Sequence, residues 1–152
     1  MTPKEEREAI AEREGHKQAI GKKVSSHQFS DNDTAEIVGW GVTSNKIAFN
    51  FIRVKNGECY TLSTQNSRKN SNFTPKSRKE KAERLNLSKD LNKKVVSIHP
   101  MAFRVGDTAE IVGWSFNEDE HSPQYLIRFE NGECCFIAGG DNFKYSGFQF
   151  QK

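Results

Sequence analysis

The chain has 152 residues, of which 34% are hydrophobic and 28% charged, and its formal net charge is +3. This length allows one domain or two very small ones, and the composition is polar but sufficient for a folded core. No apolar run approaches the roughly 18–20 residues of a membrane span, and the charged beginning lacks the apolar core of a signal peptide. With three cysteines in no CxxC spacing, we expect reduced thiols and a cytoplasmic location.

Residues 1–21 are predicted to form an N-terminal helical segment. Thr2 can cap a helix that has Pro3 at its first position and Glu5 at its third, which is capping-box spacing. The helix should run from Pro3 to about Glu14 and end at Gly15. Because its apolar residues are few, we expect it to fray or to pack weakly.

Two segments of the chain are duplicated. Eight residues recur unchanged as Asp33–Trp40 and Asp107–Trp114, and an Asn-Gly-Glu-Cys segment recurs as Asn56–Cys59 and Asn131–Cys134. The first match is offset by 74 residues (33 to 107) and the second by 75 (56 to 131). A self-match at nearly constant distance indicates a repeated unit. Two copies of one small β-unit are therefore predicted, over residues 22–75 and 94–152.

Each unit is predicted to contain about five short strands. Alternation in the first duplicated segment places Glu36, Val38 and Trp40 on one face of a strand. Ala35 and Ile37 then lie on the opposite face. The Asn-Gly pair of the second duplicated segment predicts a type I′ hairpin turn, in which both residues have positive φ.

The segment between the units is predicted to be a basic helical connector, residues 76–93. Residues 67–94 contain ten basic and three acidic side chains, a net of +7, whereas residues 95–152 contain four and eight, a net of −4. Ser77 and Glu80 have capping-box spacing, so a short helix is expected at about 78–87. The connector could bind nucleic-acid phosphates, or it could be a linker that the acidic second unit neutralises.

If the connector binds nucleic acid, the contact residues are expected to be basic side chains on or just before its helix. They are Arg68, Lys69, Lys76, Arg78, Lys79, Lys81 and Arg84.

The second unit resembles the SH3-like small β-barrel, a broad group that includes KOW and Tudor modules. The resemblance is carried by Phe103–Trp114, Tyr125–Phe129 and Asn131–Glu133. The first unit departs from it where Ser30–Asp33 stands in place of Arg104–Asp107. The resemblance implies a mainly β fold with two tandem five-stranded barrels, and it implies binding more than catalysis.

Five residues are candidates for a binding site: Trp40, Phe51, Arg53, Trp114 and Arg128. The tryptophans could stack a base or a peptide side chain, but packing at the end of a barrel or between the repeats is the interpretation that we favour. Each arginine is expected to pair across strands with a glutamate, and anion capture is the alternative.

No catalytic or metal-binding residue is predicted. Cys59, Cys134 and Cys135 are not in ligand spacing with any histidine, and hydrophobic packing is their default role. The sequence contains none of the GxGxxG, P-loop, HExxH or GxSxG patterns, and no cofactor is expected.

These observations predict a non-enzymatic regulatory or inhibitory protein that binds a partner protein through its barrels, as a monomer or homodimer. The phage-encoded inhibitors of host factors are the context that we expect for such a compact binder. One alternative is an RNA- or DNA-binding protein that uses the connector. Another is a binder of a small anionic ligand, such as a nucleotide, held between the repeats by Arg53 and Arg128.

Overall fold

The computed structural model describes residues 2–25, 34–61, 75–98, 106–117 and 121–151. Within these residues the fold is mainly β, with nine strands in two antiparallel sheets. The strands are β1 (Lys23–Ser25), β2 (Thr34–Val42), β3 (Ala48–Arg53), β4 (Cys59–Thr61), β5 (Lys94–Ser97), β6 (Thr108–Phe116), β7 (Pro123–Phe129), β8 (Cys134–Ala138) and β9 (Phe148–Phe150). The helices are α1 (Pro3–Arg13), α3 (Pro75–Leu85) and the 3₁₀ helices η3 (Leu87–Asp90) and η4 (Gly140–Tyr145).

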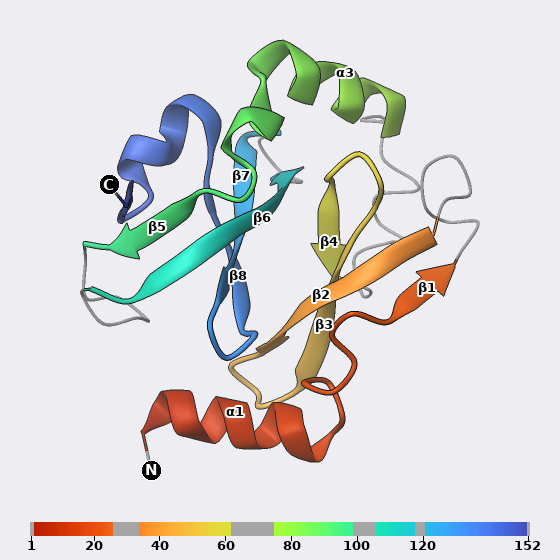
Figure 1. The fold of residues 1–152 in the computed structure, drawn as a ribbon, viewed down its shortest axis with the longest axis vertical. Coiled ribbons are helices and arrows are strands. Elements are labelled where there is room, and N and C mark those ends of the chain that lie inside the picture. The colour runs from red at the N-terminus through yellow and green to blue at the C-terminus, as the bar shows by residue number, and fades with distance from the viewer. Residues whose placement is uncertain (1, 26–33, 62–74, 99–105, 118–120, 152) are drawn as a thin grey trace.

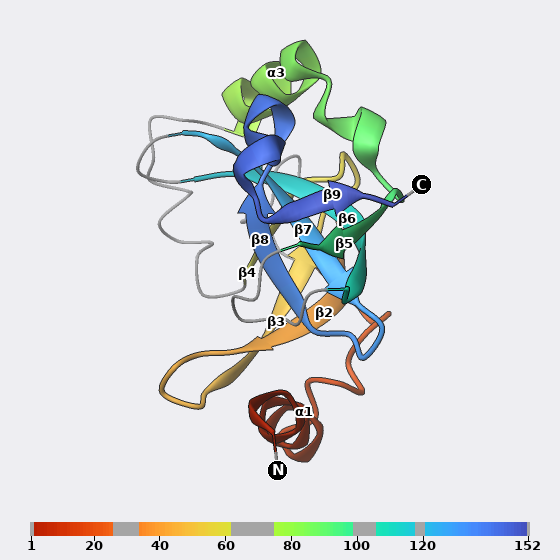
Figure 2. The same cartoon turned by 90° about the vertical axis from the view of Figure 1, so that its left-hand side faces the viewer.

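The two sheets correspond to the two duplicated units. The first has the strand order β1-β2-β3-β4 and the second the order β8-β7-β6-β5-β9. Figures 1 and 2 show the sheets side by side, with α1 at one end of the molecule and α3 at the other. A barrel requires hydrogen bonds between the two edge strands of a sheet. Neither sheet is closed in this way within the described residues, so the tandem barrels predicted from the sequence are seen here as open sheets.

Helix α1 begins as predicted and packs better than predicted. The Thr2 side chain accepts a hydrogen bond from the Glu5 backbone N–H at 3.1 Å, and the Glu5 side chain closes the capping box. Ile10 and Ala11 are both buried, and the helix packs against β2 and β3. One isoleucine and the alanine beside it, which permits close approach, are therefore enough to dock this helix.

The hairpin turns differ from the predicted type I′. Gly57 has φ +98° and Gly132 has φ +94°, but the preceding asparagines are not at positive φ. The Gly57 backbone N–H donates to the Val54 carbonyl at 3.0 Å, and the Val54 N–H donates to the Glu58 carbonyl at 2.9 Å. This is a three-residue loop with a glycine bulge, which needs only one residue at positive φ.

A β-bulge changes which face the duplicated strand presents. In β6 the pairing register shifts between Ile111 and Gly113, and Val112 is left out of the ladder. Beyond the bulge, Trp114 packs in the same cluster as Ala109 and Ile111. The predicted alternation, which placed the tryptophan on the opposite face, is therefore wrong past the bulge, because one extra residue reverses the side-chain alternation. The register of β2 shifts at the equivalent position.

Three apolar clusters form the core. One fills the second repeat and includes Trp114, and a smaller one lies in the first repeat. The third, which we call the interface core, draws equally on both sheets. Its buried members are Val38, Phe51 and Cys59 from the first sheet and Val112, Leu126 and Cys134 from the second.

Helix α3 packs against the core of the second repeat and shares two short segments with α1. In sequence, Thr2-Pro-Lys4 recurs as Thr74-Pro-Lys76, and Ala11-Glu-Arg13 recurs as Ala82-Glu-Arg84. Like its counterpart in α1, Ala82 is buried. The helix begins at Pro75, earlier than the sequence predicted, and Ser77 is therefore inside its first turn and does not cap it.

Candidate functional site

The duplicated segments contact each other across the two repeats. The Trp40 backbone N–H donates to the Gly132 carbonyl at 3.1 Å, and the Trp114 N–H donates to the Gly57 carbonyl at 3.0 Å. Each indole N–H donates to the carbonyl of the asparagine that precedes that glycine, at 3.1 and 3.2 Å. Every contact therefore occurs twice, once in each direction, as in an interface with twofold symmetry.

The two tryptophans are buried in this contact, with 0% and 1% of their surface exposed, and Phe51 is buried in the interface core. These three candidate binding residues therefore present almost no surface to a ligand in this structure. Of the two interpretations drawn from the sequence, the structure places Trp40 and Trp114 in packing between the repeats.

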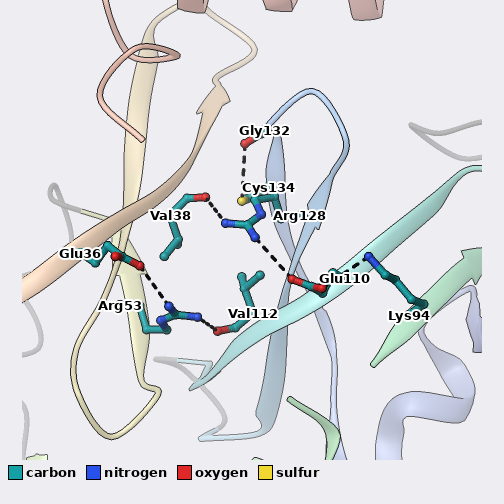
Figure 3. A network of polar contacts seen from close by, with 9 residues as sticks. All are labelled: Glu36, Val38, Arg53, Lys94, Glu110, Val112, Arg128, Gly132 and Cys134. Carbon is teal, nitrogen blue, oxygen red and sulfur yellow. Dashed lines mark hydrogen bonds and ion pairs between the residues drawn. The ribbon is translucent and has the colours of Figure 1, made fainter. Parts of the chain in front are cut away.

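Arg53 and Arg128 also cross between the repeats. Figure 3 shows the Arg53 guanidinium between the Glu36 carboxylate, at 3.1 Å, and the Val112 carbonyl of the other sheet, at 2.9 Å. Arg128 binds Glu110 at 3.3 Å and the Val38 carbonyl at 3.1 Å. The predicted Glu–Arg pairs are confirmed.

Each arginine also donates to a backbone carbonyl of the opposite repeat, a contact that the sequence did not indicate. Val38 and Val112 are the residues that the bulges leave out of the strand pairing. A carbonyl removed from a ladder needs another donor, and the arginine of the opposite repeat supplies it.

The glycine of the duplicated octapeptide is required by a cysteine of the other repeat. A Cβ at Gly39 would lie 2.1 Å from the Cys134 Sγ, and one at Gly113 would lie 2.1 Å from the Cys59 Sγ. Each thiol donates to a carbonyl of its own hairpin, at 3.6 and 3.7 Å. The glycine and the cysteine thus recur together because the glycine of each repeat lies directly against the cysteine of the other.

A helix at each end of the molecule adds one more pair of equivalent contacts. The Arg78 Nε of α3 donates to Glu58 at 2.5 Å, and the Arg7 Nε of α1 donates to Glu133 at 2.6 Å. Both glutamates belong to the hairpins of the duplicated Asn-Gly-Glu-Cys segments. The pair at Arg78 is the more buried of the two.

The thiols are placed for packing. Burial raises the pKa of Cys134 far above its usual value, and it raises the pKa of Cys135 to about 12. Such thiols remain protonated near neutral pH, whereas a nucleophilic cysteine needs a thiolate. Among the described residues no group of His, Cys, Asp and Glu side chains is arranged to hold a metal ion, and no described helix is long and apolar enough to cross a membrane.

Two surface pockets lie at equivalent places in the two repeats. One is lined by Lys23, Thr34, Ala35, Glu36, Arg53, Val54 and Lys55 and has a volume of about 350 Å³. The other is lined by Lys94, Thr108, Ala109, Glu110, Arg128, Phe129 and Glu130 and has a volume of about 370 Å³. The two arginines therefore line separate pockets.

The basic connector is partly occupied by internal contacts. Arg78 is buried against Glu58, and the Lys81 ammonium donates to the His121 carbonyl at 2.8 Å and lies over the Phe116 ring. Other predicted nucleic-acid contacts are exposed on α3, namely Lys76, Lys79 and Arg84. Arg68 and Lys69 lie outside the described residues.

The most exposed aromatic side chain among the described residues was missed in the sequence. Tyr145, at the end of η4, is 76% exposed, and Phe150 of β9 is 39% exposed. The Lys144 ammonium lies 5.2 Å from the centre of the Tyr145 ring, and Phe150 stacks on Phe143 at 4.4 Å. Strand alternation gave no signal for this difference, because Tyr145 is two residues from Phe143 and would share its face in a strand, whereas the segment forms a 3₁₀ helix.

Comparison of the chain with family models, with curated proteins and with solved structures found no match.

Proposed function

We propose that this chain is a non-enzymatic regulatory or inhibitory protein that binds a partner protein, and that its repeats are SH3-like modules. The observation that carries this proposal is the use that the structure makes of its duplicated residues. The duplicated tryptophan, arginine, glutamate and cysteine side chains hold the two repeats together. Recognition is therefore left to the outer surface, as in a binding module.

The strand order supports the SH3-like assignment. In the second sheet the first strand of the unit, β5, lies between the second and the last, β6 and β9. This arrangement brings the beginning and the end of the unit together, which a small barrel requires. The 3₁₀ helix η4 connects β8 to β9 and packs against both.

The surface that supports protein binding best comprises η4 and β9, and we call it the η4–β9 surface. Phe143 anchors it in the core, and the Ser146 N–H donates to the Phe143 carbonyl at 2.9 Å. Tyr145 is thus an exposed ring on a fixed support. Aromatic residues are enriched in protein interfaces because they bury a large area and lose little conformational freedom.

The test is capture of a partner by the tagged full-length chain from a nuclease-treated lysate, washed in about 0.5 M salt, which screens contacts that depend on charge alone. Tyr145→Ala is expected to reduce recovery of the partner strongly. Ile47→Ala is the matched control, because Ile47 is an exposed apolar residue of the first repeat, far along the chain from η4. Recovery that Tyr145→Ala leaves unchanged, or that nuclease abolishes, would contradict the proposal.

Nucleic-acid binding by α3 is the second candidate, and its exposed cations favour it. Glu80 and Glu83 are exposed on the same helix and reduce the net charge of that surface. This function predicts affinity that falls steeply with salt and that is lost when Lys76, Lys79 and Arg84 are changed to glutamate.

A further inference from the structure

The two equivalent pockets have different charges. The pocket of the first repeat is lined by three cations and one carboxylate, a net of +2, from Lys23, Arg53, Lys55 and Glu36. The pocket of the second repeat is lined by two cations and two carboxylates, a net of zero. One substitution between the repeats accounts for the difference: Lys55 stands where the second repeat has Glu130.

The ion pairs within the pockets differ in the same direction. In the second pocket Glu110 binds both Arg128, at 3.3 Å, and Lys94, at 3.4 Å, as Figure 3 shows. In the first pocket Glu36 binds Arg53. Among the described residues, no carboxylate lies within 4.0 Å of the ammonium of Lys23 or Lys55. Two lysines therefore remain available to an anion in the first pocket.

Arg53 gives this pocket a fixed positive charge. Its guanidinium is held by the Val112 carbonyl and by Glu36, so its position does not depend on a ligand. Thr34 is an exposed residue of its lining, and Ala35 and Val54 are buried, apolar residues of the same lining. A volume of about 350 Å³ is at the lower end of the range of ligand pockets, roughly 300–1,000 Å³, and suits a small molecule better than a polymer.

We propose that the pocket formed by Lys23, Thr34, Arg53 and Lys55 binds the phosphate group of a small phosphorylated molecule. Two ammonium groups and a fixed guanidinium surround a space that a phosphate can enter, and charge-assisted hydrogen bonds to phosphate are among the strongest available to side chains. The site belongs to the first repeat alone. It is independent of the η4–β9 surface and of the partner-binding proposal.

The test uses the full-length chain and three probes: inorganic phosphate, adenosine monophosphate and uncharged adenosine. Calorimetry gives affinity and stoichiometry, and amide NMR shifts give the location. We expect one site for both phosphate-bearing probes, none for adenosine, and shifts centred on Lys23, Thr34 and Lys55. Equal affinity for phosphate and adenosine monophosphate assigns recognition to the phosphate alone, and tighter binding of the nucleotide adds a contact to the rest of the molecule.

Two reciprocal variants make the test specific. Lys55→Glu gives the first pocket the charge of the second and is expected to weaken binding about tenfold or more. Glu130→Lys gives the second pocket the missing cation and is expected to raise the stoichiometry from one toward two. Both side chains are exposed, so neither change should affect folding.

Lys79→Glu, on the exposed face of α3, is the control for overall charge. It should leave the affinity within about twofold of the original protein, because Lys79 does not line the pocket and an exposed charge outside it is screened by salt. The proposal is overturned if no probe shifts the pocket amides, if Lys79→Glu weakens binding as much as Lys55→Glu, or if Glu130→Lys leaves the stoichiometry unchanged.

Discussion

The pockets beside Arg53 and Arg128 stand on equivalent strands and share a Lys, a Thr, an Ala, a Glu and an Arg, yet one has a net charge of +2 and the other is neutral. The contact between the repeats shows the opposite behaviour. There, tryptophan, glycine, arginine and cysteine are the same in both copies, and each makes the same contact in each direction. The residues that are identical in the two copies thus build the contact between the repeats. The residues that differ lie on surfaces where the two repeats can bind different ligands.

The largest effects should come from breaking the symmetric contact at a tryptophan. Trp40→Ala and Trp114→Ala each remove a buried ring and its hydrogen bond, and each is expected to lower the free energy of unfolding by about 3–5 kcal/mol. Urea denaturation should show a single transition for both, because the repeats share the interface core. A biphasic curve, with one half unfolding at its original midpoint, would mean that the repeats fold independently.

Substitution of Arg78 and Arg7 tests whether the two equivalent arginine–glutamate pairs contribute equally to the free energy of unfolding. Arg78→Ala leaves Glu58 buried without its guanidinium and should cost about 3–5 kcal/mol. Arg7→Ala affects a pair that is closer to solvent, so roughly 1.5–3 kcal/mol is expected, the range for hydrogen bonds to charged groups. Thermal or urea unfolding measures both, with Lys79→Ala as an exposed control on α3. Equal losses for the two arginines would contradict the difference in burial.

A smaller effect isolates one contact between the repeats. Gly39→Ala places a Cβ against the Cys134 Sγ and should destabilise the protein by about 1–3 kcal/mol. In a double-mutant cycle, Cys134→Ala should relieve part of that loss, since it removes the sulfur. Cys59→Ala, the same change in the other repeat, should add to it independently. Equal coupling to both cysteines would show that the strain is not local.

Several features of the fold could be predicted because they depend on neighbouring residues. The Thr2 capping box needs only the spacing of Thr2 and Glu5, and it forms as predicted. The cross-strand pairs of Glu36 with Arg53 and Glu110 with Arg128 follow from strand alternation before the bulge. The hairpins were found at the right places, but the turn type was wrong, because a bulged three-residue loop and a two-residue loop share the Asn-Gly signal.

The match between α3 and α1 was missed although its signal is in the sequence. Its basic composition suggested a linker or a nucleic-acid surface, whereas its Thr-Pro-Lys and Ala-Glu-Arg segments repeat those of α1. The offset of the second of these is 71 residues (11 to 82), while the octapeptide is offset by 74 (33 to 107). A change of spacing within the repeat concealed the match.

By itself, then, the sequence determined that the protein is two copies of one β-unit, because duplication and strand periodicity can be recognised from the order of the residues along the chain. The tertiary structure decided which face each duplicated tryptophan presents, since one bulged residue reverses the alternation. It also decided that the two duplicated segments bind each other, Trp40 to Gly132 and Trp114 to Gly57. Those partners are distant along the chain, and only the packing of one sheet against the other brings them within hydrogen-bonding distance.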